Sequence, residues 1–149
     1  MIPAVFRGLC PGGDLETHHR SPCVEDEISK VGSEFKDYVK FFKLCLSSPP
    51  WEIQRMWARR ALAGRSFAAI APTGVGKTAF GLVTSYYFAV RGRGRSYLLF
   101  PTSLLVDQAV EILTKYKRSA GEPLKILAYR SGMRSKQRRE FLEKLESGD

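Results

Sequence analysis

The 149-residue sequence has no apolar run of the roughly 18 to 20 residues that a membrane-spanning helix needs. Its start, MIPAVFRGLCPGGDLE, has no sustained apolar stretch and therefore does not resemble a secretory signal peptide. The cysteines are too few and odd in number for a disulfide framework, which fits a reducing compartment; they are Cys10, Cys23 and Cys45. These absences predict a cytoplasmic protein with no membrane partner.

Acidic residues are scarce in one part of the chain. The stretch from Arg91 to Arg139 holds twelve Lys or Arg and only three Asp or Glu, whereas the rest of the chain holds twelve of each. The whole net charge of +9 therefore comes from this stretch. Such an imbalance predicts a polyanionic partner, most often nucleic acid, and a well-solvated basic surface is the alternative.

The hydrophobic pattern predicts helices that alternate with short apolar strands. Apolar residues recur at helical spacing in the segments 28–46, 50–64, 78–90, 104–117 and 135–147. The apolar face of the first segment consists of Ile28, Val31, Phe35, Val39, Phe42 and Leu46. Continuous apolar runs predict buried strands at 66–71, 96–100 and 124–129. We therefore expect an α/β fold, a parallel sheet with flanking helices, over residues 28–149, preceded by an irregular segment at 1–27.

The stretch IAPTGVGKTA, residues 70–79, has the composition of a phosphate-binding loop. In such a loop glycines let backbone N–H groups turn toward an anion, and the following helix adds its positive N-terminal end. A lysine then reaches the β and γ phosphates and a hydroxyl binds Mg²⁺, roles that fall here to Lys77 and Thr78. The pattern predicts nucleoside triphosphate binding, and a chance glycine turn is the alternative. The residues expected to hold the nucleotide are Ala71, Pro72, Thr73, Gly74, Val75, Gly76, Lys77 and Thr78.

Three motifs in order along the chain resemble the superfamily 2 helicase core of the DEAD-box type. PWEIQRMW contains Gln54 and resembles the Q motif, APTGVGKT resembles motif I, and PTSLLVDQ resembles motif Ia. The resemblance implies a RecA-like P-loop NTPase domain in which the amide of Gln54 pairs with adenine and selects ATP. It also implies that a nucleic acid backbone meets Pro101, Thr102 and Gln108.

A narrower resemblance, to the reverse gyrase family, runs from about Trp51 to Asp149. It rests on PWEIQRMWARRALAGRSFAAIAPTGVGKTAFGL, on LLFPTSLLVDQAVEIL and on YRSGMRSKQRREFLEKLESGD. Reverse gyrases join such an ATPase to a type IA topoisomerase and introduce positive supercoils into DNA. The resemblance therefore implies ATP and Mg²⁺ as cofactors, DNA as the partner, and a nucleic acid contact near Arg130.

The start of the chain departs from the reverse gyrase pattern, in which paired cysteines form a zinc ribbon. Gly13 and Asp26 stand where the partners of Cys10 and Cys23 would be. Because structural zinc takes four good ligands, we expect residues 1–27 to be a degenerate zinc-ribbon-like segment without zinc. A site completed by a histidine is the alternative.

Two parts that ATP hydrolysis needs in this family are missing from the sequence. They are an acidic DEAD or DExH tetrad and a second RecA-like domain with an arginine finger. We therefore expect the N-terminal part of a larger enzyme, whose remaining helicase-like and topoisomerase domains are fused or on a separate chain. Alone, it is expected to bind ATP weakly and hydrolyse it negligibly. The alternatives are a fragment of another superfamily 2 DNA or RNA helicase, and a passive DNA-binding module with a vestigial phosphate loop.

Overall fold

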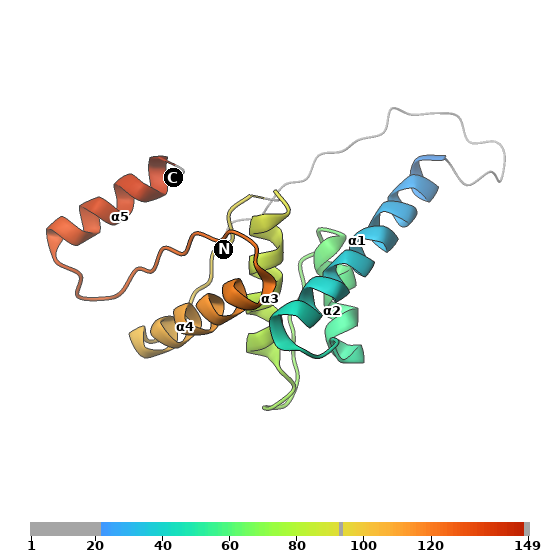
Figure 1. Cartoon of the computed structure of the whole chain (residues 1–149), viewed down its shortest axis with the longest axis horizontal. Helices are drawn as coiled ribbons and strands as arrows, with labels where there is room; N and C mark the ends of the chain where they lie inside the picture. The colour runs from blue at the N-terminus through green and yellow to red at the C-terminus, as the bar shows by residue number, and fades with distance from the viewer. Residues whose placement is uncertain (1–21, 93, 148–149) are drawn as a thin grey trace.

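Helices account for all the regular secondary structure of the residues described by the computed structural model, 22–92 and 94–147, with side chains described from Gly32 onward. They are α1 (Pro22–Leu46), α2 (Glu52–Leu62), α3 (Lys77–Val90), α4 (Ser103–Ala120) and α5 (Ser135–Ser147), as Figure 1 shows. Each lies where the hydrophobic pattern predicts a helix. Across this described part of the chain, no helix combines the length and the apolar character that crossing a bilayer requires.

Helix α1 starts earlier than the sequence predicts. It begins at Pro22, so residues 22–27 are helical and do not belong to an irregular segment. Proline is well tolerated at the first helical position, because its φ is preset and its missing N–H would have no partner there. The remainder of the expected N-terminal segment, residues 1–21, lies outside the described residues. The helix ends at Leu46, ahead of Pro49 and Pro50, which cannot continue it.

The core forms where α1 packs against α2, α3 and α4. The most buried side of α1 is rotated from the predicted one, because α3 and α4 cover a different set of side chains than the apolar spacing suggests. Its buried residues are Tyr38, Phe41, Phe42 and Cys45. Of the predicted face, Phe35, Val39 and Leu46 are only half-buried. Burial raises the pKa of the Cys45 thiol to about 12, so this cysteine is a core residue and not a reactive one.

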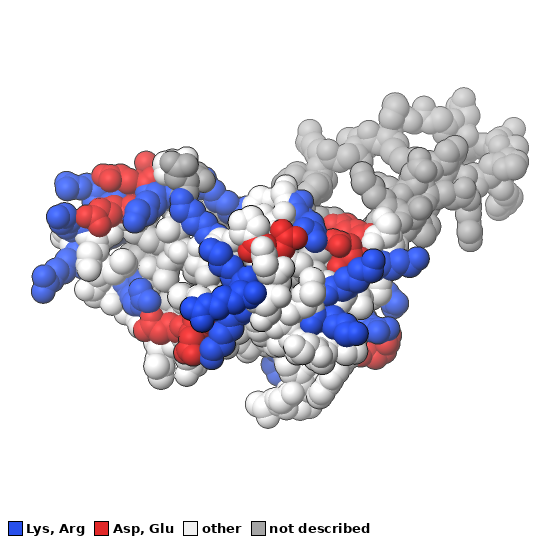
Figure 2. All heavy atoms as spheres, in the orientation of Figure 1, with Lys and Arg blue, Asp and Glu red and all other residues white. Residues whose placement is uncertain are grey.

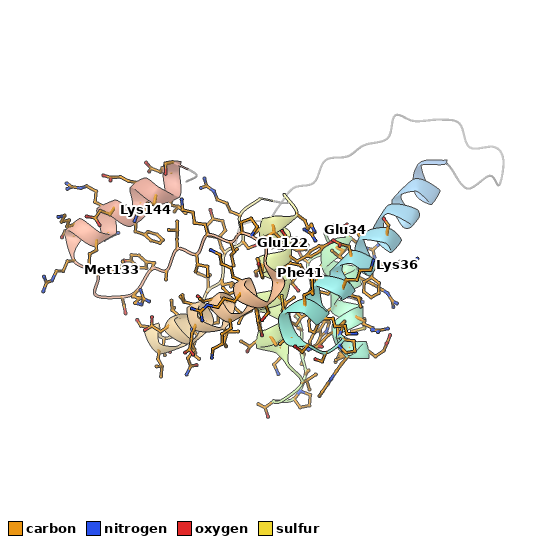
Figure 3. All side chains as sticks on the ribbon, viewed as in Figure 1. Glu34, Lys36, Phe41, Glu122, Met133 and Lys144 are labelled. Carbon is orange, nitrogen blue, oxygen red and sulfur yellow. The ribbon has the colours of Figure 1, made fainter. Side chains whose placement is uncertain are left out.

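Aromatic rings hold α1 and α3 together. Phe41 stacks edge-on against Tyr86 with ring centroids 4.8 Å apart, and Tyr38 does the same against Tyr87 at 5.2 Å. Such pairs contribute roughly 0.5–1.5 kcal/mol each beyond the apolar area that they bury. The buried hydroxyl of Tyr38 lies 2.9 Å from the Thr84 hydroxyl, so the polar end of the ring is also satisfied. Figure 3 shows Phe41 on the side of α1 that faces α3.

The predicted parallel sheet is not formed among residues 22–92 and 94–147. The segments 66–71, 96–100 and 124–129 run as extended chain, and no backbone hydrogen bond joins one to another within this range. Burial nevertheless alternates along two of them, as it does in a strand that is covered on one face. Phe67, Ala69 and Ile126 pack toward the helices, whereas Ile70 and Leu99 are 89% and 95% exposed. The apolar runs therefore predicted chain segments without helix here, but they did not predict whether the segments pair. Pairing into a sheet also requires a neighbouring strand at hydrogen-bonding distance.

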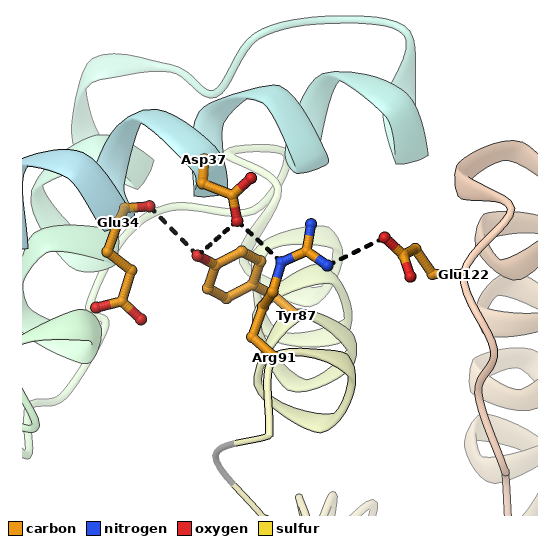
Figure 4. Close-up of polar contacts among 5 residues, drawn as sticks. All are labelled: Glu34, Asp37, Tyr87, Arg91 and Glu122. Carbon is orange, nitrogen blue, oxygen red and sulfur yellow. Dashed lines mark hydrogen bonds and ion pairs between the residues drawn. The ribbon is translucent and has the colours of Figure 1, made fainter.

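An ion-pair cluster fastens α1 to the end of α3 and to the chain after α4 (Figure 4). The Arg91 guanidinium donates to Asp37 at 2.9 Å and to Glu122 at 3.0 Å. The Tyr87 hydroxyl donates to the same Asp37 oxygen at 3.1 Å. Burial opposes ionisation of Asp37, but the bonds from Arg91 and Tyr87 outweigh it and lower the pKa of this carboxyl below its ordinary value of 3.8. The two carboxylates in turn raise the pKa of Arg91.

Replacing Arg91 with Met should remove both ion pairs while keeping a chain of similar length. Because all three side chains are partly exposed, we expect the free energy of unfolding to fall by only about 1 kcal/mol in urea titrations followed by circular dichroism. A carboxylate with a lowered folded-state pKa stabilises the protein above its unfolded-state value of 3.8 and loses this effect as pH falls through the folded value. The difference between variant and parent should therefore shrink below that pH.

The matched control is Arg118→Met, since Arg118 is exposed in the last turn of α4 and has no ion pair with another described residue. Its effect should stay within about 0.5 kcal/mol. An Arg91 effect that is undiminished at pH of about 2 would show that the ion pairs are not its source.

Candidate functional site

The phosphate loop connects the extended segment 65–72 to the start of α3. Gly74 and Gly76 have φ values of +88° and +76°, a left-handed conformation that residues with a Cβ rarely adopt. Helix α3 begins at Lys77 directly after this turn, and Gly76 provides no side chain to cap it. The first N–H groups of α3 therefore have no partner within the helix and are available to an anion.

Lys77 folds back across the loop. Its ammonium donates to the carbonyl oxygens of Ala71 and Pro72, at 2.6 and 2.7 Å. Thr78, one residue further along the first turn, is exposed. An open groove of about 460 Å³ starts here and is lined by Thr73, Gly74, Gly76, Lys77, Thr78, Ala79, Leu82, Ile112 and Tyr116. The structure thus brings five of the eight predicted loop residues together around this groove, whereas Ala71, Pro72 and Val75 do not line it. Ala71 and Pro72 instead accept the hydrogen bonds of the Lys77 ammonium.

Gln54 links α2 to the phosphate loop. It is 95% buried, since only 5% of the residue is exposed. Its Oε1 accepts from the Trp51 N–H at 2.9 Å, which caps the first turn of α2. Its Nε2 donates to the carbonyl oxygens of Val75 and Gly76, both at 3.3 Å. The glutamine expected to read adenine is therefore also the side chain that contacts the loop.

A second, smaller hollow of about 160 Å³ adjoins Gln54 on the side away from Lys77. Its lining comes from the end of α1, the 48–51 turn and the loop, and consists of Phe42, Leu46, Ser48, Pro49, Trp51, Gln54, Gly74, Val75 and Gly76. The sequence reasoning missed Trp51 and Phe42 as members of this site. A tryptophan immediately before the Gln54 helix is a signal that could have identified the first. Nothing in the sequence could have identified the second, because Phe42 reaches the hollow only through the packing of α1.

The four residues predicted to meet nucleic acid also come together, at the start of α4. Pro101 and Thr102 precede the helix, and the Thr102 hydroxyl caps it by accepting from the Leu105 N–H at 3.3 Å. Gln108 is exposed on the second turn of α4. Arg130 lies beside it, because its guanidinium pairs with Asp107. None of the four lines the groove at the phosphate loop, so the two predicted sites remain distinct.

The described residues contain no group of metal-ligating side chains that could hold an ion on its own. Cys10 lies outside these residues, and Cys23 lies in α1 but its side chain is not described. The expectation about zinc therefore stays a prediction. Neither hollow at the phosphate loop has Asp or Glu in its lining.

The comparison with protein families agrees with the motifs. The DEAD/DEAH box helicase family matches residues 51–147, from Trp51 to the last residue of α5. This match covers the Gln54 helix, the phosphate loop, α3, α4 and α5 together. The chain belongs to the DEAD/DEAH box helicase family. Membership implies the RecA-like architecture of that family, although the sheet is not formed in the described residues.

Comparison with individual proteins confirms the narrower resemblance to reverse gyrases. Reverse gyrase 1 of Aquifex aeolicus is 34% identical over the whole of this chain, and reverse gyrase of Pyrobaculum aerophilum is 44% identical over 77% of it. Reverse gyrase of Methanocaldococcus jannaschii is 36% identical, again over the whole chain. The chain spans only 15%, 9% and 11% of the length of these three relatives.

The geometry of Gly76 predicts a coupling between Gln54 and the loop of this helicase family member. A Cβ at Gly76 would lie 2.6 Å from Gln54 Nε2, whereas a Cβ at Gly74 would have no atom within 4 Å. Both glycines have positive φ, so either alanine adds backbone strain of about 1–2 kcal/mol. Gly76→Ala should weaken ATP-analogue binding and stability more than Gly74→Ala, because it also displaces Gln54.

A double-mutant cycle with Gln54→Ala tests this prediction by urea unfolding. The extra cost of Gly76→Ala over Gly74→Ala should largely disappear once the glutamine is removed, with a coupling energy of at least about 0.5 kcal/mol. Equal costs in both backgrounds would mean that the amide does not occupy the space above Gly76.

Proposed function

We propose that this chain is the nucleotide-binding and DNA-binding portion of a reverse gyrase, an ATP-dependent type IA topoisomerase that introduces positive supercoils. The observation that carries the proposal is the junction of Gln54, Gly76 and Lys77, where an adenine-reading amide and a phosphate-binding loop touch. The sequence relatives support it, since reverse gyrases match over most or all of the chain.

The proposed nucleotide lies across the two hollows that share Gly74 and Gly76. The loop N–H groups and the start of α3 hold the phosphates, and Lys77 exchanges the two carbonyls for phosphate oxygens. Thr78 would hold Mg²⁺, which supplies positive charge for the β and γ phosphates. Adenine enters the hollow beside Trp51, where Gln54 has one free lone pair on Oε1 and can turn its amide toward the base.

Hydrolysis by this chain alone is proposed to be negligible. A DEAD-type ATPase needs an acidic pair near the phosphates and an arginine finger from a second RecA-like domain. No carboxylate lines either hollow, so nothing among the lining residues can orient a water for attack. The activity therefore belongs to the larger protein, in which further domains contribute these groups.

The three extended segments are proposed to be strands of a RecA-like parallel sheet that further polypeptide completes. Their inward side chains already pack on the helices, and their outward residues Ile70, Tyr97 and Leu99 are largely exposed. Parallel sheets are buried on both faces by helices, so such outward apolar side chains are those that a second helical layer covers. This chain spans only 15% and 9% of the length of two of its relatives. Those relatives therefore have additional polypeptide that could form the second helical layer.

Lys77→Ala should abolish binding of a fluorescent ATP analogue, because the loop loses its only ammonium group. Lys117→Ala is the matched control: its ammonium also donates to a backbone carbonyl, that of Leu124 at 2.9 Å, but lies outside the loop. We expect Lys117→Ala to keep analogue binding within about twofold of the parent. Binding that survives in Lys77→Ala would instead favour a vestigial loop on a passive DNA-binding module.

DNA binding is proposed to use the start of α4 and the basic first half of α5. Helix α5 contacts no other described helix, and the Tyr129–Phe141 ring pair and the bond from Arg95 to the Leu145 carbonyl help to anchor it. Its basic residues Lys136, Arg138 and Arg139 lie near its start and follow Arg134. The left of Figure 2, where α5 lies, shows Lys and Arg side chains together with acidic ones. The basic side chains at the start of α5 are expected to contact DNA phosphates and not base edges, because they lie on the exposed surface of a helix.

Affinity for a fluorescein-labelled duplex should fall steeply with salt and should not depend on sequence, because phosphate contacts release counterions. The α5 triple variant, Arg134→Gln/Lys136→Gln/Arg138→Gln, should reduce the magnitude of the slope of log K against log salt by up to about three. Two duplexes of unrelated sequence should give superimposable curves. Affinity that does not change between about 50 and 200 mM salt would refute phosphate-based binding.

A further inference from the structure

Helix α1 carries a row of exposed lysines, which the net-charge pattern of the sequence conceals. Residues 32–92 hold nine Lys or Arg and only three Asp or Glu. The chain outside Arg91–Arg139 sums to zero because residues 1–27 and residues 140–149 each hold three more acidic than basic residues. The part of α1 from Gly32 onward and α2 together hold six Lys or Arg and three Asp or Glu, so this part of the surface is basic, as the right side of Figure 2 shows. Glu25, Asp26 and Glu27 lie earlier in α1.

The lysine row consists of Lys36, Lys40 and Lys43. Their spacing of four and three residues places them on one side of α1, and all three are exposed. On a helix this side lies opposite the buried residues Tyr38 and Phe41. Figure 3 shows Lys36 on the outer side of α1. No lysine of the row forms an ion pair with another described residue, whereas the guanidinium groups of Arg91 and Arg130 are paired.

Charges of opposite sign are separated around α1. Asp37 lies on the flank that faces α3, and its carboxylate is taken up by Arg91 and Tyr87. Lys40 also helps to lower the pKa of Asp37 through its charge, but it forms no ion pair with this carboxylate. A cation in the last turn of a helix also favours the helix dipole, which accounts for Lys43 but not for Lys36 or Lys40.

The row continues onto α2. The Arg59 guanidinium lies over the Phe35 ring, 4.7 Å from its centroid, so an α2 side chain reaches across to the residue beside Lys36. Arg59 and Arg60 are both exposed and have no ion pair with the residues described. The basic surface therefore extends over the contact between α1 and α2. Because the two helices pack against each other, the charges on them are held at a more fixed spacing than charges on one isolated helix.

We propose that this α1–α2 surface is a second duplex DNA contact, separate from the one at α4 and α5. The lysine row spans about 10 Å at 1.5 Å per residue. One DNA strand presents a phosphate about every 3.4 Å along its axis, so the row matches about three phosphates. The proposal rests on the proposed DNA binding and adds a second place where the duplex touches the protein. Such a contact engages the backbone without reading sequence.

The test is fluorescence anisotropy of a duplex of about 30 base pairs, roughly three helical turns, with three variants of the whole chain. They are Lys36→Gln/Lys40→Gln/Lys43→Gln, the same three positions changed to Arg, and the α5 triple variant. We expect the Gln row variant to reduce the salt slope by up to about three. Between about 50 and 200 mM salt its affinity should then fall about 40-fold less than that of the parent. The Arg variant keeps the charge and should bind like the parent.

The outcomes separate this inference from the proposed function. Unchanged affinity and slope in the Gln row variant, with a loss in the α5 variant, would overturn the α1–α2 contact and leave the proposed function standing. A loss of DNA affinity in the Gln row variant alone would support the α1–α2 contact and would reject the contact proposed for α5. Binding of the row to phosphatidylserine vesicles without an effect on DNA would assign the surface to a membrane and overturn the inference.

A second measurement needs no substitution. Bound duplex should protect Lys36, Lys40 and Lys43 from acetylation, read by mass spectrometry, with Lys115 as an internal reference because Glu111 pairs with it at 2.8 Å. Equal labelling of the row with and without DNA would contradict the proposed contact. Circular dichroism of each variant should match the parent, since the three lysines are exposed and bond to no buried group.

Discussion

The contact between Gln54 and the carbonyls of Val75 and Gly76 is the constraint on which the site depends. It fixes the first turn of α2 against the phosphate loop, and it requires a residue without Cβ at position 76, since that atom would lie 2.6 Å from the amide. The same turn starts α3, so the helix that presents its N-terminus to phosphate is oriented by a side chain from another helix. The proposed base recognition and phosphate binding would therefore both depend on the position of Gln54.

Helix α1 packs against the helices that carry both candidate sites. It packs against α3, which follows the phosphate loop, and against α4, whose start carries Thr102 and Gln108. On one side of α1 Tyr38 fills the core, and on another Asp37 is held by Arg91. The third side carries the lysine row. A helix that contacts both neighbours in this way is suited to keep the spacing between a nucleotide and a bound strand constant.

The extended segments have apolar side chains that pack on the helices and others that are exposed to solvent. Phe67 and Ile126 lie against the helices, whereas Ile70 and Leu99 are almost fully exposed on the other side of the extended segments. Several large apolar residues with such high exposed fractions are unusual on one folded domain. The proposed sheet and the proposed larger enzyme account for them together, because both require another layer on that side.

Local rules were enough to locate the helices and the phosphate loop from the amino-acid sequence. Apolar spacing located α1 to α5, and the pattern of Gly74, Gly76, Lys77 and Thr78 specified a turn between an extended segment and a helix. The predicted sheet is not confirmed for the described residues, because strand pairing depends on partners that are distant in sequence.

The remaining features of the fold and the site depend on the tertiary structure. It selected the buried side of α1, brought Gln54 onto the loop, and placed Asp37 and Glu122 on the same Arg91. It also left the lysine row of α1 without an ion pair among the described residues. These features are contacts, or missing contacts, between residues far apart in the chain, and neither composition nor periodicity encodes them.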